Sequence, residues 1–171
     1  SVPLSLDTRH PENARLALDF GFLWINDVSG FSNPAMRDTV RGYNCTCVSM
    51  HSLTVPADKN ITLPEHADVI SVLSQWALQV KEYELKNLIL DPGIGFGKTA
   101  AQSWQIIDRI GELKALGLPL LIGHSRKSFL GAGDGDAATL AVSKKLIAAG
   151  VDYLRVHDVA AHRRLLEEAH D

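Results

Sequence analysis

The sequence predicts an α/β fold in which parallel strands alternate with helices. Short apolar runs alternate with amphipathic segments from one end of the chain to the other. The runs are apolar at nearly every position, which is typical of parallel strands covered by helices on a buried sheet. A polar residue follows almost every run directly. Together these observations indicate repeated βα units.

Six such units can be placed along the chain. Gly21, Gly117 and Gly150 each follow a helical pattern, where a left-handed residue commonly ends a helix. We expect one domain over residues 1–171. The predicted strands span residues 2–6, 22–25, 46–49, 88–90, 120–122 and 153–156. The predicted helices span residues 11–20, 34–41, 65–84, 101–116, 137–149 and 160–169.

The number of strands and the residues at their ends favour different architectures. A (β/α)8 barrel has eight strands and usually about 250 residues, whereas an open doubly wound sheet is complete with six or fewer. In an open sheet, however, only the strands at the switch point face the ligand, whereas all strand ends of a barrel meet at one mouth. Polar residues follow all six predicted strands. We therefore predict a TIM (β/α)8-type barrel that lacks its first two βα units.

Composition and charge exclude several classes of function. The 171 residues are 46% hydrophobic and 22% charged, as in soluble globular proteins. The formal net charge of −3 provides no basic field for nucleic acid or an anionic membrane surface. No apolar run approaches the roughly 20 residues of a membrane-spanning helix. Cys45 and Cys47 match neither a zinc site nor a C-x-x-C redox pair, so we expect reduced thiols and a cytoplasmic protein.

The glycine-rich segment at residues 90–99 is the most informative motif. A P-loop is excluded because Pro92 stands where that motif needs its first glycine. A dinucleotide-binding site is excluded because no acidic residue ends the next predicted strand. What remains is Asp91 at a strand end, before a turn that lets a flat ligand approach the backbone. Its carboxylate can accept two N–H bonds from a pterin or a guanine. Alternatively, Asp91 caps the next helix.

Three sequence blocks, at residues 91–98, 123–128 and 155–158, closely resemble the signature blocks of dihydropteroate synthase. The strand ends at residues 5–8, 25–28 and 50–51 match the same family in the same order, so the resemblance covers essentially the whole chain. It implies a transferase that joins 6-hydroxymethyl-7,8-dihydropterin pyrophosphate to para-aminobenzoate, giving 7,8-dihydropteroate and pyrophosphate in folate synthesis. It also implies Mg²⁺ as cofactor and a homodimer formed through the last helices.

The resemblance assigns the pterin site to residues at the ends of several strands. Hydrogen bonds to the ring are implied for Asp7, Asn26 and Asp91. Packing on the ring is implied for Val28 and Met50, and Gly123 is implied to leave room for it.

The resemblance also assigns the second substrate and the leaving group. Lys127 is implied to contact the pterin carbonyl edge and to shape the aminobenzoate site. Phe96 is implied to form an apolar wall, and Ser128 to receive the aminobenzoate carboxylate. Arg155 and His157 are implied to hold the pyrophosphate, and with Lys127 they form the expected catalytic set. The alternative for these three cationic residues is solvated surface charge. No residue of the chain is assigned as a metal ligand.

The departures from the family leave other functions open. Two strands that the family places first are absent before Ser1, together with the loops that help to bind metal, pyrophosphate and aminobenzoate. A catalytically inactive barrel that binds pterin or a partner is therefore the alternative. A corrinoid-linked methyltransferase on the same barrel is a third possible function. The Ser125–Lys127 block argues against this function. Among other histidines, we expect His51 and His124 near the mouth and His162 on the surface.

Overall fold

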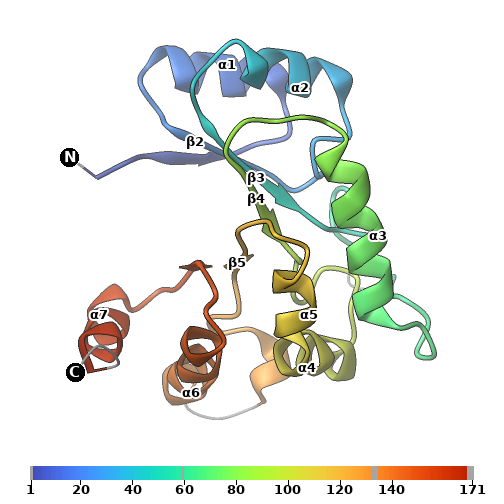
Figure 1. The fold of residues 1–171 in the computed structure, drawn as a ribbon, viewed down its shortest axis with the longest axis vertical. Helices are drawn as coiled ribbons and strands as arrows, with labels where there is room; N and C mark the ends of the chain where they lie inside the picture. Colours follow the sequence, from blue (N-terminus) through green and yellow to red (C-terminus); the bar gives the residue numbers. More distant parts are fainter. Residues whose placement is uncertain (1, 59, 132–134, 169–171) are drawn as a thin grey trace.

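The computed structural model describes residues 2–58, 60–131 and 135–168, and these contain six parallel strands (Figure 1). One sheet contains β1 (Ser5–Asp7), β2 (Trp24–Asp27), β3 (Thr46–Met50) and β4 (Leu88–Asp91) in that order. β5 (Leu121–Ile122) pairs with β6 (Tyr153–Leu154). A parallel bridge between Leu90 and Leu120 connects β4 to the segment that leads into β5.

The order of the strands distinguishes the two architectures. Every strand lies beside its neighbour in the chain, and all pairs are parallel. In a doubly wound sheet the order reverses at a switch point, whereas in a barrel it follows the chain. The predicted six-stranded part of a TIM-type barrel is therefore confirmed.

Helices follow each strand and cover the outer face of the strands (Figure 1). Several begin at side-chain caps, as at Asn33, at Asp68 and in the capping box of Thr99 with Gln102. A short 3-10 helix, η1 (Ser128–Leu130), follows β5. The α-helices are α1 (Pro11–Asp19), α2 (Pro34–Arg41), α3 (Val69–Lys81), α4 (Ala100–Asp108), α5 (Ile110–Lys114), α6 (Gly135–Ala148) and α7 (Val159–Glu168).

Some element boundaries differ from the prediction. The helix expected over 65–84 begins only after the Asp68 cap, and the helix expected over 101–116 is divided at Arg109. The strand expected over 153–156 is only two residues long, because its pairing with β5 ends at Leu154. Ala169, the expected end of the last helix, lies outside the described residues.

The strands β2 to β5 are buried on both faces, which accounts for their continuous apolar sequence, whereas β1 and β6 at the open side are partly exposed. Residues such as Ile25 and Ile122 pack with the helices in the main core. The alternate residues Val48, Ile89 and Leu121 form a second cluster inside the curved sheet, against Trp24. Alternating side chains of one strand thus serve two apolar layers.

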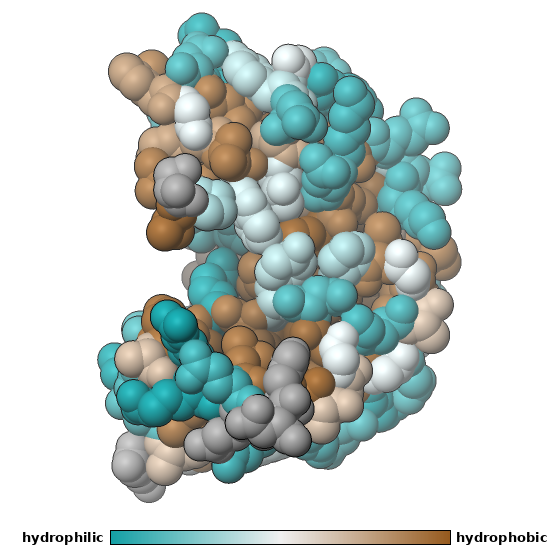
Figure 2. All heavy atoms as spheres, turned by 60° about the vertical axis from the view of Figure 1, so that its left-hand side comes forward, coloured by the Kyte–Doolittle hydropathy of each residue, from teal (hydrophilic) through white to brown (hydrophobic). Residues whose placement is uncertain are grey.

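The curved sheet is open on one side. Within the described residues, β6 does not pair with β1, and a groove of about 690 Å³ lies there. Trp24 and Tyr153 line it, with ring centroids 5.2 Å apart and edge to face. Figure 2 shows a deep hollow in this side of the molecule. None of the described helices has the length and apolar character needed to cross a membrane.

Candidate active site

Polar side chains from four strands meet at the carboxyl ends of the sheet. The parallel register places Asp7 beside Asn26, whose Nδ2 donates to Asp7 Oδ2 at 2.9 Å. Arg155, directly after β6, donates from Nη1 to Asn26 Oδ1 at 3.4 Å and from Nη2 to Asp91 Oδ2 at 2.9 Å. One connected network thus joins residues that lie far apart in the sequence, as the barrel prediction requires.

Asp91 is the most deeply buried carboxylate of this network, with 1% of its surface exposed. Its Oδ1 accepts the N–H of Gly93 at 2.8 Å, and its Oδ2 faces Arg155. The next helix, α4, is capped by Thr99, so the alternative role of Asp91 as a helix cap is excluded. Burial raises the pKa of Asp91, and the positive charges of Arg155 and Lys127 oppose that shift.

The glycine turn after Asp91 packs tightly against the chain that follows β3. Gly93 has a φ of +65°, and a Cβ on it would lie 1.9 Å from the carbonyl oxygen of His51. Gly97 has a φ of +67°, and a Cβ there would lie 2.5 Å from Cγ of Leu53. Only glycine combines this backbone conformation with such close contact.

A buried lysine, to which sequence analysis gave no role, holds this turn in place. Nζ of Lys98 donates to the carbonyl oxygens of Phe96 at 2.9 Å and Gly93 at 3.1 Å. It also lies 2.9 Å from Nδ1 of His51. When Lys98 is protonated, its ammonium has no lone pair, so Nδ1 of His51 accepts and the ring proton of His51 is on Nε2. The sequence held no signal for this cluster beyond the position of Lys98 at the end of the motif.

The electrostatics of this cluster follow from its burial. Burial, and then the charge of Lys98, lower the pKa of His51 to about 3, so the imidazole is neutral at neutral pH. Burial likewise lowers the pKa of Lys98 to about 7, although the charge of Asp91 opposes that shift.

The expected aminobenzoate residues also come together in part. Nζ of Lys127 lies 4.3 Å from the ring centroid of Phe96, in a cation–π contact. Burial lowers the pKa of Lys127, and the Asp91 charge opposes this.

Met50 is buried beside Asp91 in the strand register. A Cβ on Gly123 would lie 3.0 Å from Nη2 of Arg155, so the guanidinium fills the space above this glycine.

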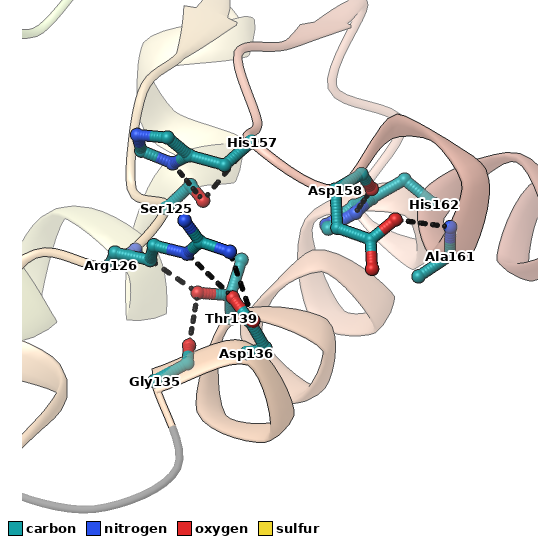
Figure 3. Close-up of polar contacts among 9 residues, drawn as sticks. All are labelled: Ser125, Arg126, Gly135, Asp136, Thr139, His157, Asp158, Ala161 and His162. Carbon is teal, nitrogen blue, oxygen red and sulfur yellow. Dashed lines mark hydrogen bonds and ion pairs between the residues drawn. The ribbon is translucent and has the colours of Figure 1, made fainter.

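Three other expected residues lie apart from this network. Val28 is half-buried after β2, and Ser128 is exposed at the start of η1. His157 is exposed, and its Nδ1 faces Ser125 Oγ at 2.8 Å rather than Arg155 (Figure 3). Within the described residues, no hydrogen bond links these three residues to Asp91 or Arg155.

The expectations for two other histidines were wrong. His162 is 6% exposed, not on the surface, because α7 packs its face against α6. Its Nε2 lies 2.8 Å from Oγ of Ser143, and its Nδ1 lies 2.7 Å from the carbonyl oxygen of Asp158. His124 is fully buried against α6, where its Nε2 also contacts Ser143 Oγ at 2.8 Å, so it does not line the mouth.

The residues at the site do not form a metal centre by themselves. In the parts of the chain that the structure describes, no group of three His, Cys, Asp or Glu side chains converges as ligands. Mg²⁺ is commonly held by one or two carboxylates together with substrate phosphates. The described residues therefore fit Mg²⁺ only if a phosphorylated ligand supplies part of the coordination.

Comparison with known families identifies the family to which the chain belongs. Residues 1–157 match the family of pterin binding enzymes. The chain belongs to this family. The match spans all six strands, and it therefore contains every polar residue of the network described above.

Individual pterin binding enzymes are similar over most of this chain. A probable bifunctional folylpolyglutamate synthase/dihydropteroate synthase of Halobacterium salinarum is 41% identical over 92% of this chain and 21% of its own length. Dihydropteroate synthase of Synechocystis is 36% identical over 98% of this chain and 63% of its own length. This chain thus spans about a fifth of the first relative and less than two thirds of the second.

Solved structures agree with the fold. The crystal structure of dihydropteroate synthase from Thermus thermophilus has a TM-score of 0.88 at 32% identity, covering 99% of this chain and 72% of that one. The same enzyme in complex with 4-aminobenzoate has a TM-score of 0.88 at 33% identity, covering 97% and 69%. The barrel architecture and the family are therefore both established.

Proposed function

We propose that this protein condenses 6-hydroxymethyl-7,8-dihydropterin pyrophosphate with para-aminobenzoate, which gives 7,8-dihydropteroate and pyrophosphate. The observation that carries the proposal is the buried Asp91 carboxylate, joined to residues of three other strands at one mouth. Similar dihydropteroate synthases have been crystallised with 4-aminobenzoate, with 6HMPPP and with 7,8-dihydropteroate, which supports these substrates and this product.

Asp91 suits the edge of a pterin. A carboxylate accepts N–H bonds, and the pterin edge offers a ring N–H and an amine. Asp91 Oδ2 is bound by Arg155 in the free protein, so the ligand must displace the guanidinium from this oxygen. That exchange is feasible because the side chain of Arg155 is 44% exposed, and because ligand N–H groups replace the hydrogen bond that Asp91 loses. The released Arg155 is then free to bind phosphate.

The charges of the site match the charges that develop in the reaction. As the bond between the pterin methylene carbon and the pyrophosphate oxygen breaks, positive charge grows at the carbon and negative charge on the leaving group. The carboxylates of Asp91 and Asp7 stabilise the positive charge at the carbon. Arg155 and His157 stabilise the negative charge on the leaving group. The neutral amine of para-aminobenzoate forms the new C–N bond, and its proton passes to solvent or to the released pyrophosphate. No strong protein base is needed.

The second substrate has its own set of residues in the proposal. Phe96 provides an apolar wall for the aminobenzoate ring, and the neighbouring Lys127 reaches toward both substrates. The exposed hydroxyl of Ser128 receives the aminobenzoate carboxylate.

The proposal includes Mg²⁺ bound with the pyrophosphate, a cytoplasmic location and a homodimer formed through α6 and α7. Sedimentation at micromolar concentration should give twice the mass of the chain, and a monomer would contradict the dimer.

One observation favours a second candidate, a barrel that binds pterin or a partner without turnover. The groove between β1 and β6 leaves the interior of the barrel open near Asn26 and Arg155. Release of pyrophosphate from the pterin substrate, measured with and without para-aminobenzoate, separates the two. The enzyme releases pyrophosphate and forms dihydropteroate only when both substrates are present. Calorimetric binding of the pterin ester without product would support the binding module instead.

A further inference from the structure

The loop after β5 is fastened to α6 on one side. The backbone N–H of Arg126 donates to Thr139 Oγ1 at 3.1 Å, and its guanidinium donates to both carboxylate oxygens of Asp136 at 2.8 and 3.0 Å (Figure 3). Arg126 has a φ of +56°, a left-handed conformation that turns the chain at this point. These contacts fix the position of the preceding residue, Ser125.

Ser125 faces the other way, toward the segment after β6. Its Oγ lies 2.8 Å from Nδ1 of His157 and accepts the backbone N–H of His157 at 3.3 Å. Ser125 is 7% exposed, and within the described residues its hydroxyl makes these two hydrogen bonds. The hydroxyl proton therefore has Nδ1 as its acceptor, whereas an Nδ1–H group would leave that proton buried without a partner.

This hydrogen bond determines where the ring proton of a neutral His157 lies. With Nδ1 as an acceptor, the proton is on Nε2. Figure 3 shows the second ring nitrogen of His157 on the side away from Ser125, and the residue is exposed. His157 therefore presents an exposed N–H donor on the side away from Ser125.

We propose that Ser125 is a positioning residue, which holds His157 in the Nε2–H tautomer so that this N–H donates to an oxygen of the departing pyrophosphate. The identity of that acceptor rests on the proposed function. The tautomer itself does not depend on it. Without the serine hydroxyl, the imidazole loses its orienting partner, so the ring rotates and both tautomers are populated.

The tautomer can be measured without substrate. In protein labelled with ¹⁵N-histidine, long-range ¹H–¹⁵N spectra at pH 8 distinguish a protonated from an unprotonated ring nitrogen, and the His157→Gln variant assigns the signal. We expect His157 to have an unprotonated Nδ1 and a protonated Nε2. Ser125→Ala should bring the two nitrogen shifts toward each other, and Ser125→Thr, which keeps a hydroxyl, should restore them. Ser71→Ala, a matched change on the exposed face of α3, should alter neither.

An Nδ1–H tautomer in the unmodified protein would overturn the proposal, as would shifts that Ser125→Ala leaves unchanged. Titration with inorganic pyrophosphate provides a second measurement. We expect it to move the Nε2 signal of His157, whereas free 6-hydroxymethylpterin should leave that signal in place. The opposite pattern would contradict the assignment of the phosphate acceptor.

Kinetics test whether Ser125 acts through His157. Ser125→Ala should lower kcat for pyrophosphate release about tenfold, the effect of roughly one hydrogen bond, and leave the KM for para-aminobenzoate within about twofold. In the His157→Gln background, Ser125→Ala should have no further effect. An equal loss in both backgrounds would refute a positioning role. If the unmodified protein forms no product, the proposed function fails, and the tautomer and pyrophosphate titrations still decide this inference.

Discussion

The two halves of the candidate site are constructed differently. On the β1–β4 sheet, Asn26, Met50 and Asp91 are buried within strands of four or five residues. On the β5–β6 side, Arg155 and His157 are exposed and follow β6, which like β5 has only two residues. The first half therefore holds these three buried side chains in one fixed arrangement, whereas the second half has side chains that can move.

In the proposed function, this difference corresponds to two tasks. A flat heterocycle is recognised by hydrogen bonds of defined direction, which a rigid strand end supplies at little entropic cost. The proposed pyrophosphate must be bound and then released, and the exposed N–H donors of Arg155 and His157 on short connections can follow it. Asp91 and Arg155 are the contact between the halves: the carboxylate is buried, and its guanidinium partner is not.

The rigid half should be the more sensitive to a backbone change. Gly93→Ala places a Cβ 1.9 Å from the carbonyl oxygen of His51 at a φ of +65°. We expect it to lower the free energy of unfolding by about 3 kcal/mol or more in urea denaturation. Gly21→Ala is the matched control, because its φ is +87° and nothing lies within 4 Å of the added Cβ. It should cost only about 1 kcal/mol. Equal losses would show that the close contact is not what matters.

Asp91→Asn should have the largest effect on ligand binding. One carboxylate oxygen becomes an NH₂ group that faces either the ligand N–H groups or Arg155. We expect the affinity for 6-hydroxymethylpterin to fall about 100-fold, or roughly 2.7 kcal/mol, in calorimetry. Asp38→Asn on the exposed face of α2 should leave it unchanged. An unaltered affinity for Asp91→Asn would disprove the assignment of the pterin edge.

Arg155→Ala should separate the two halves. The pyrophosphate ester of the pterin should bind about tenfold more weakly, because a charge-assisted contact to phosphate is lost. Free 6-hydroxymethylpterin should change less than about threefold, because Arg155 is displaced from Asp91 when the ring binds. Arg15→Ala, an exposed arginine on α1, is the control. Losses of the same size for both ligands would contradict the proposed division.

The smallest expected effect is a pH dependence in the rigid half. The pKa of His51 is lowered to about 3 by burial and by Lys98, from 6.5 in an unfolded chain. Between these values the unfolded chain binds a proton that the folded protein does not, so the free energy of unfolding decreases as the pH falls. Relative to His51→Asn, whose amide oxygen can still accept from Lys98, we expect an additional loss of about 1 kcal/mol from pH 6 to pH 5. Parallel profiles of unfolding free energy against pH for the unmodified protein and His51→Asn would contradict this prediction.

The order and kind of the elements could be predicted because their signals are local. Continuous apolar runs predicted all six strands, and caps such as Asn33 and Thr99 start helices through bonds to residues two or three positions away. The position of Asp91 at the end of a strand was also predictable, because β4 ends where its apolar run meets the first acidic residue.

The partners of the site residues were decided only by the tertiary structure. Asp91 and Arg155 are 64 positions apart, and Ser125 and His157 are 32 apart, so no local pattern indicates that they meet. His162 has the sequence context of a surface residue, and it is buried because α7 packs on α6. A strand or helix forms from interactions within a few residues, whereas burial, tautomer and ion pairing depend on distances that exist only after the elements have packed.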